Sequence, residues 1–170
     1  MNSTQSDQPI SPQVVTSVHA AFVDLGSVGV RFLARAADTG GALSILEHPV
    51  PPLTLAAPLH RHTREDEYSY VLEGTMGALL GSEVVHAEVG TLVFKPRGQW
   101  HTFWNAGQAP CRVLEIIAPG GFEGMFAEIA ADPESMTGES AAALDARYGL
   151  EVDYESIERL CSVYGLSFPM

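Results

Sequence analysis

The chain has 170 residues, of which 46% are hydrophobic and 18% are charged, and its formal net charge is −12. This length is typical of one domain that can bury a sizeable core. The negative charge opposes binding to phosphate backbones and anionic membranes, and no apolar run reaches the roughly 20 residues of a membrane-spanning helix, so neither nucleic acid nor a membrane is an expected partner.

The N-terminal segment, residues 1–12, is polar and has neither the basic start nor the apolar centre of a secretory signal. We expect residues 1–15 to be flexible. The two cysteines, Cys111 and Cys161, lie far apart in the sequence and form no zinc-binding motif. They do not require an oxidising compartment, so the expected location is the cytoplasm.

Short runs typical of β-strands, separated by turn residues, follow as far as residue 117. The runs 28–36 and 42–49 are joined by the turn cluster 38–41, which favours a hairpin. Further strands are predicted at 67–72, 77–80, 83–87, 91–95, 102–105 and 112–117. Many short strands at this spacing indicate a mostly β domain, either a sandwich or a closed barrel, over residues 16–120.

The hydrophobic period changes after residue 120, and residues 121–170 are predicted to form a helical C-terminal extension. Apolar residues recur there at helical spacing; they are Phe122, Met125, Phe126 and Ile129. Two more helices are expected at 140–148 and 154–164, with a glycine after each as a stop signal. We expect the first helix to pack against the outside of the barrel without gating a pocket.

One short segment, His60-Arg61-His62, carries two histidines at strand spacing. Alternate side chains of a strand share a face, so both imidazoles point the same way, as binding of one metal ion requires. Glu67 adds an oxygen ligand and His101 a third nitrogen. A six-coordinate divalent ion held by these four residues keeps two positions free for water or substrate.

Two neighbouring carboxylates, Glu65 and Asp66, are alternatives to Glu67 as the ligand. Glu67 is favoured because strand alternation from that residue places Ser69 and Val71 on the same face. The remaining histidines are not accompanied by other candidate ligands at a metal-binding spacing; they are His19, His48 and His86. His86 lies in a hairpin-like stretch and is expected to be solvated.

Glycines and prolines frame the four candidate ligands. The first segment reads His60-x-His62-x4-Glu67-x6-Gly74, and the second reads Gly90-x5-Pro96-x-Gly98-x2-His101-x3-Asn105. This pattern resembles the two signature motifs of the cupin superfamily, apart from Thr54, where the family often has a turn glycine. The resemblance implies a cupin β-barrel (a double-stranded β-helix, or jelly roll). It also implies that His60, His62, Glu67 and His101 hold one divalent transition metal ion.

The extension is similar to that of small bacterial cupins grouped with quercetin 2,3-dioxygenase. This resemblance implies a homodimer, but it does not extend to the substrate. The chemistry of the four ligands and of the apolar residues near them favours a metal-dependent dioxygenase acting on a small aromatic or enol-containing compound. In that reaction Glu67 would also serve as the general base. Three apolar residues, Val71, Phe94 and Phe103, are predicted to line the substrate pocket, and Phe103 is the best placed because it lies two residues after His101.

Two other functions fit the same residues. One is a non-redox metal-dependent isomerase, cyclase or lyase, and the other is a ligand-binding cupin without turnover. The four ligands accept Fe, Mn, Ni, Co, Cu or Zn, so the sequence does not select the metal. The strands between residues 28 and 47 are the expected dimer contact, because an uncovered β-edge would otherwise favour aggregation.

Overall fold

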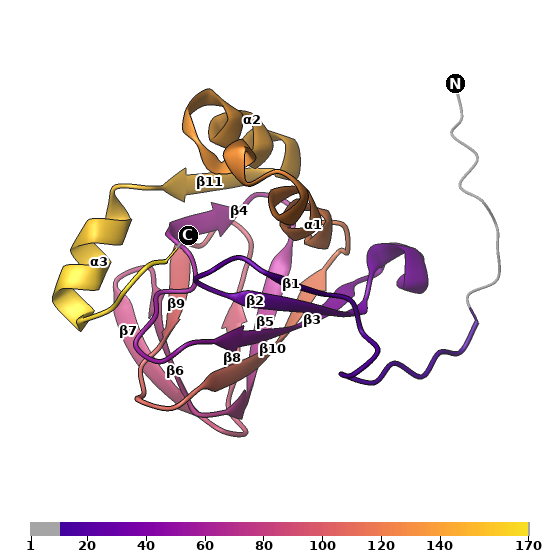
Figure 1. Cartoon of the computed structure of the whole chain (residues 1–170), viewed down its shortest axis with the longest axis horizontal. Helices are drawn as coiled ribbons and strands as arrows, with labels where there is room; N and C mark the ends of the chain where they lie inside the picture. Colours follow the sequence, from indigo (N-terminus) through magenta and orange to yellow (C-terminus); the bar gives the residue numbers. More distant parts are fainter. Residues whose placement is uncertain (1–10, 170) are drawn as a thin grey trace.

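Two antiparallel sheets enclose the core, and helices cover one end and one side of them (Figure 1). The computed structural model describes residues 11–169. The six-stranded sheet has the order β1-β2-β3-β10-β5-β8. Its strands are β1 (Phe22–Asp24), β2 (Gly29–Ala34), β3 (Ser44–Val50), β10 (Cys111–Ala118), β5 (Asp66–Glu73) and β8 (Leu92–Lys95).

The five-stranded sheet has the order β11-β4-β9-β6-β7. Its strands are β11 (Leu150–Asp153), β4 (Leu59–His62), β9 (His101–Asn105), β6 (Thr75–Leu80) and β7 (Glu83–Glu88). The predicted mostly β jelly-roll barrel is therefore confirmed, and the strands expected from the turn-punctuated pattern all form. The expected hairpin also forms: β2 pairs with β3, and a short 3-10 helix, η1 (Ala36–Thr39), lies between them.

Strand alternation decides which side chains face the interior. In β5 the buried residues are Glu67, Ser69 and Val71, while Tyr68 and Tyr70 point to the other face. Alternate residues of β10 are buried in the same way, including Glu115. The barrel interior thus contains charged groups as well as the apolar residues of an ordinary core.

Three α-helices follow the barrel: α1 (Glu123–Ala131), α2 (Gly138–Tyr148) and α3 (Ser156–Tyr164), with a 3-10 turn, η2 (Pro133–Met136), between the first two. Gly149 and Gly165 end α2 and α3 in the left-handed conformation, with φ of 69° and 65°, as their positions predicted. Within residues 11–169, no helix combines the length and the hydropathy that crossing a bilayer demands.

The predicted boundary at residue 120 does not separate the barrel from the extension. Strand β11 lies inside the predicted helical segment, yet it pairs with β4, so that Val152 faces His60 and Leu150 faces His62. The extension therefore completes the sheet that carries two of the candidate ligands. The predicted flexible segment falls mostly on residues 1–10, which lie outside the described residues.

Helix α1 does not pack on the outer wall of the barrel, so that prediction was wrong. Phe122 and Met125 are buried in one core cluster with residues of β2, β3 and β10, and Phe126 and Ile129 line an internal cavity. The helix covers one end of the barrel (Figure 1). The predicted dimer edge also needs correction, because β2 and β3 are interior strands and the end strand of that sheet is β1.

Candidate metal centre and adjoining cavity

Three strands from two sheets bring the four predicted ligands together. His60 and His62 lie on β4, His101 lies beside them on β9, and Glu67 reaches them from β5 in the opposite sheet. All four side chains are buried, and one ligand atom from each lies within 4.8 Å of the others. The sequence prediction of which residues meet is thus matched by their positions in the fold.

Backbone carbonyls orient two of the imidazoles. The Nδ1 atom of His60 is 2.7 Å from the carbonyl oxygen of Pro58, and Nδ1 of His101 is 2.9 Å from that of Gln99. A carbonyl only accepts hydrogen bonds, so each Nδ1 carries the proton, and in the neutral ring Nε2 presents a lone pair to the cluster. Metal-binding histidines are commonly held in this way.

The contacts with Glu67 test whether a cation fits the cluster. Nε2 of His101 lies 3.0 Å from Oε2 of Glu67, and Nε2 of His62 lies 3.2 Å from Oε1. Because Nδ1 of His101 carries the proton, the lone pair on its Nε2 faces a carboxylate oxygen, which is repulsive unless a cation joins them. In addition, neither ring nitrogen of His62 has a hydrogen-bond partner among the described residues, although both are buried. The donor set is therefore compatible with a single metal ion.

The two alternative carboxylates occupy other positions. Glu65 is buried behind His62, with its Oε2 atom 3.5 Å from Nδ1, on the side of the ring away from Glu67. Asp66 accepts hydrogen bonds from Arg97 at the surface. Neither residue belongs to the four-residue cluster.

A buried lysine, which the sequence analysis did not single out, links the cluster to a second carboxylate. Nζ of Lys95 lies 2.9 Å from Glu67 and 3.0 Å from Glu115, and the hydroxyl of Ser69 also donates to Glu115. Lys95 is only 2% exposed. Strand alternation could have indicated this network, because Lys95, Ser69 and Glu115 all take inward positions.

The two carboxylates differ in their affinity for protons. Burial alone would raise the pKa of Glu67, but the charges of Lys95 and His62 outweigh it and hold that pKa well below its usual range. Burial also raises the pKa of Glu115, and there it dominates over Lys95, so the pKa is about 7. Near neutral pH Glu115 is therefore better suited than Glu67 to take up and release a proton.

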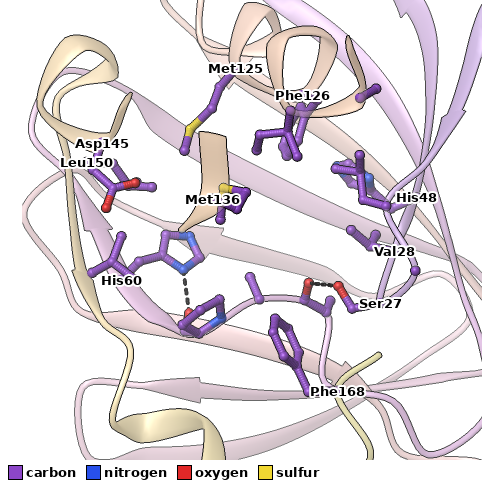
Figure 2. A pocket seen from close by; sticks show the side chains of 18 of the residues that line it. Ser27, Val28, His48, His60, Met125, Phe126, Met136, Asp145, Leu150 and Phe168 are labelled. Carbon is purple, nitrogen blue, oxygen red and sulfur yellow. Dashed lines mark hydrogen bonds between the residues drawn. The ribbon is translucent and has the colours of Figure 1, made fainter. Parts of the chain in front are cut away.

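A cavity of about 740 Å³ adjoins the cluster (Figure 2). His60, Glu67 and Glu115 contribute to it from the barrel. Much of the remaining wall comes from the C-terminal extension and is apolar; it includes Phe122, Met125, Phe126, Ile129, Met136, Leu150, Val152 and Ile157. The site thus combines a cluster of histidines with a space large enough for a small organic molecule.

The three predicted pocket residues have different positions. Phe103 lines the cavity, as its place two residues after His101 predicted. Val71 is fully buried but packs in the core cluster and is not a cavity residue. Phe94 is not a pocket residue, because it is 48% exposed and stacks on Tyr68 with ring centroids 4.8 Å apart. Of the other histidines, His86 is exposed as predicted, whereas His48 lines the cavity.

Comparison with known proteins agrees with this geometry. Residues 48–117, which contain all four clustered residues, match the family model described as the cupin domain. This segment of the chain is therefore similar to a cupin domain. The barrel has a fold similar to that of KdgF from Halomonas sp., with a TM-score of 0.60 and 15% identity over 67% of this chain and 99% of that one. It is also similar to a predicted oxalate decarboxylase from Thermotoga maritima, with a TM-score of 0.56 and 23% identity over 63% of this chain and 99% of that one.

A curated relative is similar in sequence over part of the chain. The tetracenomycin polyketide synthase protein TcmJ from Streptomyces glaucescens is 37% identical over 60 residues. This match covers 35% of the present chain and 40% of the relative, so it spans less than half of that protein. These similarities support the cupin superfamily and its fold, whereas the resemblance to quercetin 2,3-dioxygenase-like proteins stays a prediction.

Proposed function

We propose that this cupin binds one divalent transition metal ion through His60, His62, Glu67 and His101 and acts as a dioxygenase on a small aromatic or enol-containing compound. The observation that carries the metal is the buried cluster whose four ligand atoms lie within 4.8 Å of one another, with the lone pair of His101 Nε2 3.0 Å from Glu67. The apolar cavity beside the cluster supports the class of compound. The relative TcmJ carries the name of a polyketide synthase protein, which also supports it.

The bound metal would supply positions for a substrate oxygen and for dioxygen. The protein's own residues account for the rest of the proposal. Apolar side chains such as Phe103 and Phe126 exclude water around the compound. Glu115, whose pKa is about 7, lines the same cavity and would exchange a proton with a substrate hydroxyl.

A second function, non-redox isomerisation, cyclisation or elimination, is favoured by the same Glu115. A carboxyl group with a pKa near 7 can act as acid or as base without any change in oxidation state. In this alternative the ion would only polarise a carbonyl group. A ligand-binding cupin without turnover remains the third candidate, since the four ligands do not by themselves imply a reaction.

Metal analysis of the full-length protein is the first test. The wild-type protein should contain close to one metal ion per chain, and His60→Ala, His62→Ala or His101→Ala should each lose most of it. His86→Ala, which changes an exposed histidine outside the cluster, is the matched control and should keep its metal. Stoichiometric metal in all three ligand variants would show that the site is misplaced.

The reaction class is tested by oxygen uptake with a panel of phenols and enols. Iron, manganese or nickel together with substrate-dependent oxygen uptake would support the dioxygenase. Conversion of a compound without oxygen uptake would reject it in favour of the non-redox enzyme. Glu67→Gln and Glu115→Gln test which of the two carboxylates exchanges the proton with the substrate. If Glu115 carries the proton, Glu115→Gln should lose turnover but keep its metal, whereas retained turnover in that variant would contradict the role.

A further inference from the structure

Asp145, on helix α2 of the extension, is one of the residues that line the cavity, and one of its carboxylate oxygens has no partner among the described residues. The residue is more than nine-tenths buried, with 7% exposed. Oδ2 accepts a hydrogen bond from the hydroxyl of Tyr154 at 3.0 Å. Oδ1 has no hydrogen-bond partner within residues 11–169. A buried carboxylate oxygen without a partner has lost the hydrogen bonds that water would donate to it, which is unfavourable.

Figure 2 shows His48 on the opposite side of the cavity from Asp145. His48 is 3% exposed, and its Nδ1 atom is 3.0 Å from the carbonyl oxygen of Gly29. Nδ1 therefore carries the proton, and Nε2 of the neutral ring is a hydrogen-bond acceptor. Both polar groups thus accept hydrogen bonds, and neither supplies a donor.

The charges around the cavity restrict the ligand further. Four carboxylates contribute to its lining: Asp24, Glu67, Glu115 and Asp145. Among the described residues that line it, none is lysine or arginine. A phosphate or carboxylate group placed beside Asp145 would meet its negative charge with no lysine or arginine of the lining to compensate it, whereas a hydroxyl group would donate to Oδ1.

We propose that Asp145 is a specificity-determining residue that accepts a hydrogen bond from a hydroxyl group of an uncharged, largely aromatic ligand. This inference rests on the proposed function in placing the ligand in the cavity beside the metal cluster. It goes beyond that function by assigning recognition to the extension, outside the residues that match the cupin domain. His48 accepts a second hydroxyl where the ligand has one.

Fluorescence titration with three naphthalene probes tests the proposal. 2-Naphthol is neutral at pH 7 and can donate, its methyl ether has a similar shape but cannot donate, and 2-naphthoate is an anion. The full-length wild-type protein should bind 2-naphthol roughly ten- to a hundredfold more tightly than the ether, which is the range for one hydrogen bond to a charged acceptor. 2-Naphthoate should bind no better than the ether.

Asp145→Asn tests the residue itself. The amide can satisfy Tyr154 with its oxygen and then presents a donor to the cavity, so the preference for 2-naphthol should disappear. Glu139→Gln, which removes an exposed carboxylate from the same helix, is the matched control and should keep the preference. Melting temperatures of both variants show whether they remain folded.

Equal affinity of the wild-type protein for 2-naphthol and its ether would overturn the proposal without any variant. An unchanged preference in folded Asp145→Asn would overturn it as well. The titrations are run on protein as purified and after chelation, because the preference belongs to Asp145 and should persist without metal. Metal content is measured separately, so the absence of a preference for 2-naphthol can be distinguished from a failure of metal binding.

Discussion

Lys95 is the residue on which the charge balance inside the barrel depends. It lies between Glu67 and Glu115, 2.9 and 3.0 Å from their oxygens, and water does not reach it. A buried charge that loses its partner destabilises a protein strongly, because its desolvation is no longer compensated. The two carboxylates without Lys95 would also repel each other.

Lys95→Met should therefore lower the free energy of unfolding by about 3–5 kcal/mol. Urea titration measures the loss. Glu115→Gln in the Lys95→Met background removes one of the two uncompensated carboxylates and should recover part of it. A double variant no more stable than Lys95→Met would show that the ion pair with Glu115 is not the source of the effect.

His48 should make the stability of the protein depend on pH. Burial lowers the pKa of His48 from 6.5 to about 4, although its hydrogen bond to Gly29 opposes the shift. Between these values the unfolded chain binds a proton that the folded chain does not, so stability falls as the pH falls from about 6.5 to about 4. The loss should approach about 3 kcal/mol.

Urea midpoints measured across this pH range check the prediction. His48→Gln should remove most of the fall that His48 causes, whereas His86→Gln, at an exposed position of β7, should leave it as in the wild-type protein. An identical fall in wild-type protein and His48→Gln would contradict a neutral buried His48.

The sequence indicated three of the four clustered residues because their spacing is local, whereas His101, which lies 34 residues after Glu67, was indicated by the second glycine- and proline-framed segment. Two histidines on one strand and a glutamate at the start of the next follow directly from strand periodicity. The prediction that Phe94 points into the barrel was wrong by one residue. Strand alternation in β8 turns Lys95 inward and Phe94 outward. Asp145 had no such signal, since its burial depends on how α2 packs.

Strand β11 is the element that joins the extension to the candidate metal centre. It pairs with β4 along its whole length, from Leu150 opposite His62 to Asp153 opposite Leu59. Gly149, just before it, accepts hydrogen bonds at its carbonyl from both the amide and the hydroxyl of Thr63. The residue after His62 is thus fixed by the turn that leads into β11.

Gly149→Ala should destabilise the protein more than Gly165→Ala. Both glycines are left-handed, which costs an alanine about 1–2 kcal/mol. A Cβ on Gly149 would also lie 2.7 Å from Oγ1 of Thr63 and 2.8 Å from Nε of Arg64, whereas one on Gly165 would meet nothing within 4 Å. Thermal melts give the difference, and Gly149→Ala should retain less metal. Equal losses in the two variants would show that the Thr63 and Arg64 side chains move aside.

The elements missed from the sequence are the short ones. β1 has three residues and β11 has four, so neither offers enough alternation to be told from a loop. The longer strands and the three helices were predictable, because their apolar period extends over more residues. The position of α1 over the end of the barrel was not predictable. An amphipathic pattern shows that one face of a helix is buried, but it does not show which surface covers that face.

At the scale of the whole molecule, the expected homodimer remains a proposal. The order of the strands favours a different dimer contact from the one expected between residues 28 and 47. The end strands of the six-stranded sheet are β1 and β8. β8 carries Leu92 and Phe94, which are 55% and 48% exposed, beside the 39% exposed Tyr70 of β5. Exposed aromatic and aliphatic side chains at a free sheet edge favour contact with a second copy.

Light scattering at micromolar concentration should report a dimer for the wild-type protein and a monomer for Phe94→Lys. Val163→Lys changes an apolar residue of α3 that is 65% exposed, and this control should remain a dimer. A monomeric wild-type protein would reject the homodimer, and a dimeric Phe94→Lys would place the contact elsewhere.

The candidate metal ligands and much of the cavity wall come from different segments of the chain, and this has an evolutionary consequence. The four clustered residues lie within 48–117, whereas much of the apolar wall and Asp145 belong to the segment after it. Substitutions in α1, α2 or β11 can therefore diversify ligand preference while the chemistry is inherited unchanged. Homologues that share the histidine motif but differ after residue 120 should diverge in the compounds they accept, and grafted extensions should transfer that preference between them.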